Sequence, residues 1–353
     1  MGSQDIFTLG FATSYTEFGR SMLNWPRRLQ LAQLPTPLTK LTNFSKSFSD
    51  VNIWVKHDEL TGLEVSGNKV RKLEFCIAEA LEQGCNTLIT CGGVQSNHCR
   101  ATAILGARLG LKVHLILRGE RPTVPEGNLL LDYLAGAEIS YLPQRDWKTH
   151  PQFARELQEK YRTHNSKALF IPTGASDEIG LWGYIAATQE LQADFARLKL
   201  TPEFIVVATG SGGTQGGLTL GVELFAIKSQ VLAFNVSDDA AHFTAKILED
   251  VTLWQQRYKE SFDLSRLRIK TIEGYLGPGY GVAGKEVFET IRNVASSDGV
   301  FLDPVYTGKA FHGMVSELRK GANGALAGAR NVVFVHTGGL FGVFPQQQNF
   351  QFD

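Results

Sequence analysis

The chain has 353 residues, of which 43% are hydrophobic and 20% are charged. Its 35 basic residues balance 35 acidic ones, so no global field would draw it to nucleic acid or to an anionic membrane. No apolar run approaches the roughly 20 residues of a membrane-spanning helix. Residues 1–25 lack the long apolar core of a secretory signal, so we expect a cytoplasmic protein, with an organelle as the alternative. Whether residues 1–33 form an ordered cap or a processed leader stays open.

Short apolar runs alternate with longer stretches of helical periodicity through most of the chain. The first predicted strand, residues 52–55, is followed by a predicted helix over residues 70–83, which Gly84 ends. A strand at residues 87–90 and a helix at residues 96–109 come next. Further buried strands are predicted at residues 112–117, 138–142, 168–171, 204–208, 231–236 and 332–335.

This alternation predicts an α/β protein with mostly parallel strands and helices on both faces, and the chain is long enough for two such sheets. No Gly/Ser-rich or Pro-rich hinge separates two halves, so two domains would be interwoven by chain crossings. Surface loops are expected at Pro125, at Gly136 and along residues 145–150.

The four cysteines, Cys76, Cys85, Cys91 and Cys99, crowd into one stretch without a CxxC pair. Zinc sites require a ligand spacing that this stretch lacks. We therefore interpret the cysteines as buried free thiols and predict no metal site.

Lys69 follows Gly67 and Asn68, which permit an irregular turn just before the helix predicted from residue 70. The default interpretation of such a lysine is a solvated side chain. A cation is unfavourable at the positive end of a helix dipole, however, and Lys72 adds a second cation one turn later. Two cations at one helix start favour an anion close by.

A glycine-rich turn, residues 210–214, directly follows a predicted strand and opens a predicted helix. The free N–H groups and the dipole of such a turn bind phosphate. A dinucleotide fingerprint would need a third glycine where Gln215 stands. The P-loop-like stretch over residues 279–285 is followed by Glu286, where magnesium coordination requires Ser or Thr. Both nucleotide interpretations therefore fail.

The cluster Gln95, Ser96, Asn97 and His98 lies between a predicted strand and the next helix. Ser96 suits the N-cap of that helix, whose N-terminus could hold a substrate carboxylate. A lysine that can carry a cofactor as an imine, a polar clamp and a glycine-rich phosphate cradle are together the parts of a pyridoxal 5'-phosphate (PLP) enzyme.

Residues 55–75, which include the segment SGNKVRKLEF, closely resemble the fold-type II PLP family of D-cysteine desulfhydrases and 1-aminocyclopropane-1-carboxylate (ACC) deaminases. The similarity covers nearly the whole chain from about Leu34, with further matching motifs at residues 92–100, 210–213, 279–281, 303–309 and 336–339. It implies a tryptophan synthase β-like α/β fold with two interwoven domains and a homodimeric assembly. The expected large PLP-binding domain comprises residues 1–71 and 182–353, and the small domain comprises residues 72–181.

The resemblance also implies roles for individual residues. The expected cofactor-binding residues are Lys69, Lys72, Asn97, Thr209, Gly210, Ser211, Gly212, Gly213, Thr214, Thr307 and Thr337. Among these, Lys69 would bind the cofactor covalently, Asn97 would contact its ring hydroxyl, and Lys72 would help the glycine turn to hold its phosphate. The expected catalytic residues are Lys69, Ser96, Tyr280 and Tyr306. Substrate contacts are expected from Ser96, Asn97, His98, Tyr280 and Tyr306.

Two positions bear on the reaction. ACC deaminases of this family carry a glutamate at the position of Thr307 and an aliphatic residue at that of Thr337, whereas this chain matches the D-cysteine desulfhydrases at both. Position 307 is expected near the pyridine nitrogen, where a carboxylate would keep the nitrogen protonated and a threonine hydroxyl can donate to an unprotonated one.

We therefore expect α,β-elimination of D-cysteine to pyruvate, hydrogen sulfide and ammonia, with Lys69 accepting the Cα proton. β-Chloro-D-alanine is a further expected substrate. Three alternatives remain: an ACC deaminase that forms 2-oxobutyrate and ammonia, a cysteate sulfo-lyase, which would need an additional cation for the sulfonate, and a PLP-binding protein without lyase activity.

Overall fold

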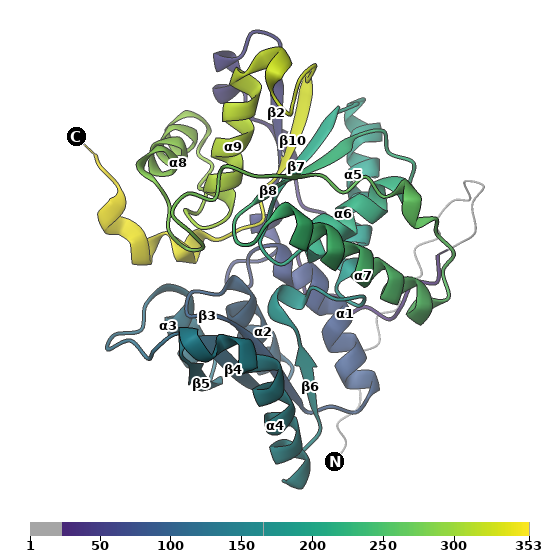
Figure 1. The fold of residues 1–353 in the computed structure, drawn as a ribbon, viewed down its shortest axis with the longest axis vertical. Helices are drawn as coiled ribbons and strands as arrows, with labels where there is room; N and C mark the ends of the chain where they lie inside the picture. The colour runs from purple at the N-terminus through teal and green to yellow at the C-terminus, as the bar shows by residue number, and fades with distance from the viewer. Residues whose placement is uncertain (1–22, 165, 353) are drawn as a thin grey trace.

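The computed structural model describes residues 23–164 and 166–352, and these residues form two sheets, one above the other in Figure 1. The larger sheet has the strand order β1 (Leu38–Lys40), β2 (Asn52–Lys56), β10 (Asn331–Val335), β7 (Phe204–Thr209), β8 (Gln230–Asn235) and β9 (Thr271–Ile272). The smaller sheet has the order β5 (Glu138–Leu142), β4 (Lys112–Arg118), β3 (Thr87–Gly93) and β6 (Ala168–Ile171). Within these described strands every pairing except β1 with β2 is parallel, which confirms the predicted fold class.

Helices cover both faces of the larger sheet (Figure 1). The α-helices are α1 (Asn68–Glu82), α2 (Asn97–Arg108), α3 (Gly127–Leu134), α4 (His150–Thr163), α5 (Leu181–Leu198), α6 (Gly213–Leu224), α7 (Ala240–Tyr258), α8 (Lys285–Asp298) and α9 (Thr307–Arg319). On β7, Val206 and Ala208 belong to the core shared with α8 and α9, while Ile205 and Val207 belong to the core shared with α5 and α6. Burial on both faces explains why the predicted strands are continuous apolar runs.

Helix α1 joins the two layers. Its Leu73 and Ile77 are fully buried in the core of the smaller sheet, and its opposite side packs against α5. A Cβ at Gly183 of α5 would lie 2.7 Å from the backbone of α1, so glycine is what permits this close contact. The predicted boundary after residue 71 falls inside α1, and the proposed division into two domains stays a prediction.

The structure changes some predicted boundaries. Helix α1 begins at Asn68, so Lys69 lies in its first turn and not before it. Strand β3 continues to Gly93, and the short strands β1 and β9 had no predicted counterpart. Residues 145–150 lie at the surface, as predicted, but the predicted loop conformation is wrong, because residues Gln144–Thr149 form the 3-10 helix η3, which leads directly into α4.

The four cysteines are buried and free, as predicted. Within residues 23–164 and 166–352, no helix is long and apolar enough to cross a membrane. The question of an N-terminal cap falls largely on residues 1–22, outside the described residues.

Candidate active site

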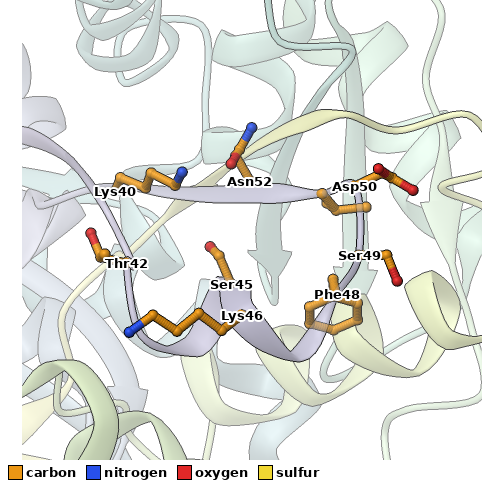
Figure 2. A pocket seen from close by; sticks show the side chains of 9 residues that line it. Lys40, Thr42, Ser45, Lys46, Phe48, Ser49, Asp50 and Asn52 are labelled. Atoms are coloured by element: carbon orange, nitrogen blue, oxygen red, sulfur yellow. The ribbon is translucent and has the colours of Figure 1, made fainter.

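A pocket of about 540 Å³ lies where the parallel strands of both sheets end. Its wall includes the expected site residues Lys69, Ser96, Asn97, His98, Thr209, Gly210, Ser211, Gly212, Thr214, Tyr280, Tyr306 and Thr337. A second pocket, of about 420 Å³, is an open hollow lined by residues 40–52, which connect β1 to β2. Figure 2 shows the side chains that line it, among them Lys40, Lys46 and Asp50. That hollow contains none of the expected site residues.

Lys69 enters the pocket from the first turn of α1. The turn before it is tight, because Gly67 has a φ of 111° and a Cβ there would lie 2.6 Å from the carbonyl oxygen of Thr337. The Nζ amine of Lys69 has no hydrogen-bond partner within the described residues. Desolvation by burial lowers the pKa of Lys69 from 10.5 to about 8, although Cys99 acts to raise it. A larger fraction of this amine is therefore neutral and nucleophilic near pH 7 than for a lysine with a pKa of 10.5.

The N-terminus of α2 forms another part of the pocket wall. Ser96 is its N-cap, as predicted, and the Ser96 Oγ accepts a 3.2 Å hydrogen bond from the backbone N–H of Cys99. The backbone N–H groups of Asn97 and His98 form no hydrogen bond within the described part of the chain. Two free donors at a helix N-terminus, beside a serine hydroxyl, suit a carboxylate.

The amide of Asn97 has a defined orientation. Its Oδ1 accepts hydrogen bonds from Arg100 Nη1 at 3.2 Å and from Asn128 Nδ2 at 3.1 Å. Its Nδ2 has no partner among the described residues, so a donor remains for an acceptor bound in the pocket.

His98 lines the same pocket, and a hydrogen bond with Thr90 holds its ring. Thr90 donates its hydroxyl proton to the carbonyl of Ile171, so Nε2 of His98 must donate to Thr90 Oγ1, over 2.7 Å. Nδ1 of His98 is then an acceptor, buried and without a partner among the described residues. Burial, together with the charges of Lys69 and Lys72, holds the pKa of His98 well below 6.5, so this ring is neutral.

The glycine turn before α6 has the features of a phosphate cradle. The backbone N–H groups of Gly210, Ser211 and Gly212 form no hydrogen bond within the described residues, and they lie at the positive end of the α6 dipole. Gly212 has a φ of 83°, a conformation that favours glycine. The Thr209 hydroxyl is buried and has no partner among the described residues, and Asn68 Nδ2 donates a 2.9 Å hydrogen bond to Thr214 Oγ1.

Two expected phosphate ligands lie behind this surface. The backbone N–H of Gly213 already donates to Ser176 Oγ at 3.1 Å, which differs from the expected contact with phosphate. Lys72 is fully buried, and its Nζ donates to the carbonyl of Gly174 at 2.8 Å and to Ser176 Oγ at 3.2 Å. Burial and the neighbouring Lys69 hold the pKa of Lys72 well below 10.5, so an anion close to Lys72 would stabilise its charged form.

Tyr280 and Tyr306 meet at the edge of the pocket, where their hydroxyl groups are hydrogen-bonded to each other. Burial raises the pKa of both phenols, so both are protonated at neutral pH. Lys309 holds the loop that carries Tyr280 by donating to the carbonyls of Leu276 at 2.7 Å and Gly279 at 2.8 Å.

Thr307 differs from the expectation. It is fully buried, it does not line the pocket, and its hydroxyl donates to Asp303 Oδ1 at 2.7 Å. A threonine hydroxyl has one proton, so Thr307 cannot also donate to a cofactor ring in this arrangement. Thr337 does line the pocket, and its hydroxyl has no hydrogen bond within the described residues.

Sequence reasoning missed several residues of the wall. Ser176 joins Lys72, Gly213 and Ser211 through its hydroxyl, but nothing in its local sequence marks it. Arg118 is the last residue of β4, next to β3, so the carboxyl-end rule for parallel strands could have indicated it. Trp147 and His150, from the stretch predicted as a surface loop, also reach the pocket.

The fold and the pocket together define the class of protein: an α/β enzyme with a nucleophilic lysine facing a phosphate cradle, which fits PLP. The model of the family of pyridoxal-phosphate dependent enzymes matches residues 29–338, and the chain belongs to that family. PLP is its cofactor.

Individual relatives agree with this assignment. A bifunctional D-cysteine desulfhydrase/1-aminocyclopropane-1-carboxylate deaminase, mitochondrial, of Arabidopsis thaliana is 40% identical over 89% of this chain and 78% of the plant protein. A putative 1-aminocyclopropane-1-carboxylate deaminase of Thermotoga maritima is 38% identical over 91% of this chain and 99% of that protein. The crystal structure of an ACC deaminase homologue has a TM-score of 0.82 at 33% identity, and covers 92% of this chain and 95% of its own.

Proposed function

We propose that this chain is a D-cysteine desulfhydrase, a lyase that converts D-cysteine to pyruvate, hydrogen sulfide and ammonia by α,β-elimination. The observation that carries this choice is Thr337, which presents a free hydroxyl to the pocket where an ACC deaminase would have an aliphatic side chain. The bifunctional name of the Arabidopsis relative supports it. β-Chloro-D-alanine, which also has a good leaving group on Cβ, is a second proposed substrate.

Bound PLP supplies an electron sink that allows the Cα–H and Cβ–S bonds of an amino acid to break. Lys69 would hold the cofactor through Nζ, and the same atom, as a free amine, would accept the Cα proton of the substrate. Its lowered pKa, about 8, suits both tasks, since attack and proton acceptance each require the neutral amine. Ser96 is a weaker base and assists as a hydrogen-bond partner.

The N-terminus of α2 binds the substrate carboxylate through Ser96 and the free N–H groups of Asn97 and His98. On the other side, Tyr280 and Tyr306 form a pair of protonated phenols, so either can supply a proton to the departing sulfur. These roles, like those of the cofactor ligands, are proposals.

The unpaired backbone N–H groups of Gly210, Ser211 and Gly212 would hold the phosphate, and Lys72, which does not line the pocket, would act through Ser176. Asn97 donates to the ring hydroxyl. We assign the hydrogen bond to the pyridine nitrogen to Thr337 and withdraw it from Thr307, because the hydroxyl proton of Thr307 is committed to Asp303.

The second candidate is an ACC deaminase, favoured by the names of the Thermotoga and Pyrococcus relatives. One experiment separates the two: sulfide and pyruvate release from D-cysteine and L-cysteine, and 2-oxobutyrate release from ACC, are measured on the same enzyme. Faster deamination of ACC than desulfuration of D-cysteine would contradict the proposal.

Assembly and location are also proposals. The family resemblance supports a homodimer, which light scattering of the purified enzyme would test. We propose a cytoplasmic location, with an organelle as the alternative because the Arabidopsis relative is named as mitochondrial.

A further inference from the structure

Arg118 occupies a specific place beside the proposed carboxylate site. It ends β4, and in the register of the smaller sheet it lies opposite Gly93, the last residue of β3. Neighbouring strands are about 4.8 Å apart, so Arg118 is one strand away from the segment that leads into Ser96 and α2. Its side chain lines the pocket that also contains Lys69.

Two aromatic rings flank the guanidinium group of Arg118. Its Cζ lies 5.0 Å from the ring centroid of Tyr280 and 5.5 Å from that of Trp147. The Trp147 ring in turn stacks on His150, with centroids 4.5 Å apart and an interplanar angle of 14°. Cation–π contacts of this kind hold an arginine in place without using its N–H groups.

Arg118 has no anionic partner in the part of the chain that the structure describes. Within the described residues it forms no ion pair, and its side chain donates no hydrogen bond. The buried Arg71, by contrast, binds the carboxylates of Asp58 and Glu190. A partly buried guanidinium whose five donors are unused is suited to an anionic ligand.

His150 supports Trp147 at the same place. Its Nδ1 donates to the backbone carbonyl of Trp147 over 2.8 Å, so Nε2 of the neutral ring is an acceptor, and His150 stacks on Trp147 without offering a donor to an anion. Among the pocket-lining residues, Asp238 is the one acidic side chain in the described part of the chain, and its Oδ2 accepts a hydrogen bond from Ser237. Asp238 forms no ion pair with Arg118, so within the described residues the guanidinium group keeps its positive charge without a paired carboxylate.

The α-carboxylate of an amino acid does not need Arg118, since the free N–H groups at α2 and the Ser96 hydroxyl already suit it. We propose that Arg118, held between Trp147 and Tyr280, forms a subsite for a second anionic group, a carboxylate or a sulfonate on the β-carbon of the ligand. This inference rests on the proposed function, because it takes the N-terminus of α2 as the carboxylate site.

A matched pair of probes tests the subsite. The first is 3-sulfopropanoate, and the second is 3-(methylsulfonyl)propanoate, which has the same shape but a methyl group in place of the anionic oxygen. Neither has an amino group, so neither can react with the cofactor. Isothermal titration calorimetry of the holoenzyme is expected to show about tenfold tighter binding of the sulfonate, the value of one charge-assisted hydrogen bond.

Arg118→Met is expected to reduce this preference to near unity, and Arg118→Lys to retain part of it. Arg121→Met is the matched control, because Arg121 also lies over an aromatic ring, that of Tyr133, but does not line the pocket. Thermal unfolding of each variant checks the fold, and Arg118→Lys provides the test if Arg118→Met does not fold.

Two results would overturn the subsite. Equal weakening of both probes by Arg118→Met would make Arg118 a ligand of the α-carboxylate, and unchanged binding of both would remove Arg118 from the site. Sulfide release from D-cysteine is measured in parallel on the wild type. Its absence with an intact sulfonate preference would contradict the proposed function alone, whereas sulfide release without that preference would contradict the subsite alone.

Discussion

Asn128 donates a 3.1 Å hydrogen bond from its Nδ2 to Oδ1 of Asn97, and this contact sets which end of the Asn97 amide is free to face the pocket. Arg100 supports the same orientation, since its guanidinium group can only donate. Asn128 is itself held by Gln95, whose Oε1 accepts from the Asn128 backbone N–H at 2.9 Å. A residue without access to the pocket therefore positions a proposed cofactor ligand.

Replacement of Asn128 tests this arrangement. Asn128→Leu removes one of the two donors that orient Asn97, so we expect PLP to bind about tenfold more weakly while Lys69 still attaches to it. Fluorescence titration of the apoenzyme with PLP measures the change. The exposed Asn323→Leu is the control, and an unchanged Kd in a folded Asn128→Leu protein would show that Asn97 needs no such support.

Lys69→Ala is expected to abolish covalent cofactor binding and turnover, because no other lysine of the described residues combines an unpartnered amine with a place in the pocket. Lys72 and Lys309 both donate to backbone carbonyls. Borohydride reduction of the wild type followed by peptide mass analysis should locate the label on Lys69. A label on Lys72 or Lys309 would contradict the assignment.

The pH dependence of cofactor attachment follows from the lowered pKa of Lys69. Below about pH 8 the amine is mostly protonated and cannot attack, so the rate of PLP attachment to apoenzyme should rise with pH and level off above about 8. An ordinary lysine, with a pKa of 10.5, would give a rate that still rises at pH 9. Stopped-flow absorbance at several pH values distinguishes the two.

Gly213→Ala should reduce PLP retention through its neighbours and not by direct contact. A Cβ at position 213 would lie 2.6 Å from Ser176 Oγ and 2.8 Å from Lys72 Nζ, so both groups behind the cradle must move. Gly342→Ala is the control, since a Cβ there would meet no atom within 4 Å. PLP content after dialysis measures the effect, and equal retention in both variants would place the phosphate elsewhere.

Substitutions at Thr307 and at Thr337 should have different effects. Thr337→Leu removes a hydroxyl from the pocket and is expected to lower the kcat of sulfide release about tenfold, with the cofactor retained. Thr307→Val removes a donor to Asp303, so its main effect should be on stability, a loss of about 1 kcal/mol. The same kcat loss with unchanged stability in Thr307→Val would restore Thr307 to a direct role.

Features encoded in short, continuous segments could be predicted from the sequence. The apolar runs of the parallel strands, the Ser96 cap, the glycine turn before α6 and the lysine at the start of α1 each depend on neighbouring residues, so periodicity and backbone preference are sufficient to place them. Together they determined the fold class and the position of the glycine turn that we propose as the phosphate cradle.

Tertiary structure decided the contacts between distant segments. The hydroxyl of Ser176 reaches Lys72, 104 residues away in the chain, and this fixes Lys72 behind the cradle. Trp147 and His150 lie in a polar stretch whose sequence has no regular pattern. They become part of the pocket because Trp147 packs on Arg118, at the end of β4, and Arg118 also contacts Tyr280 of the other layer. Side-chain partners of this kind depend on how the two sheets pack together, which neither local propensity nor residue spacing specifies.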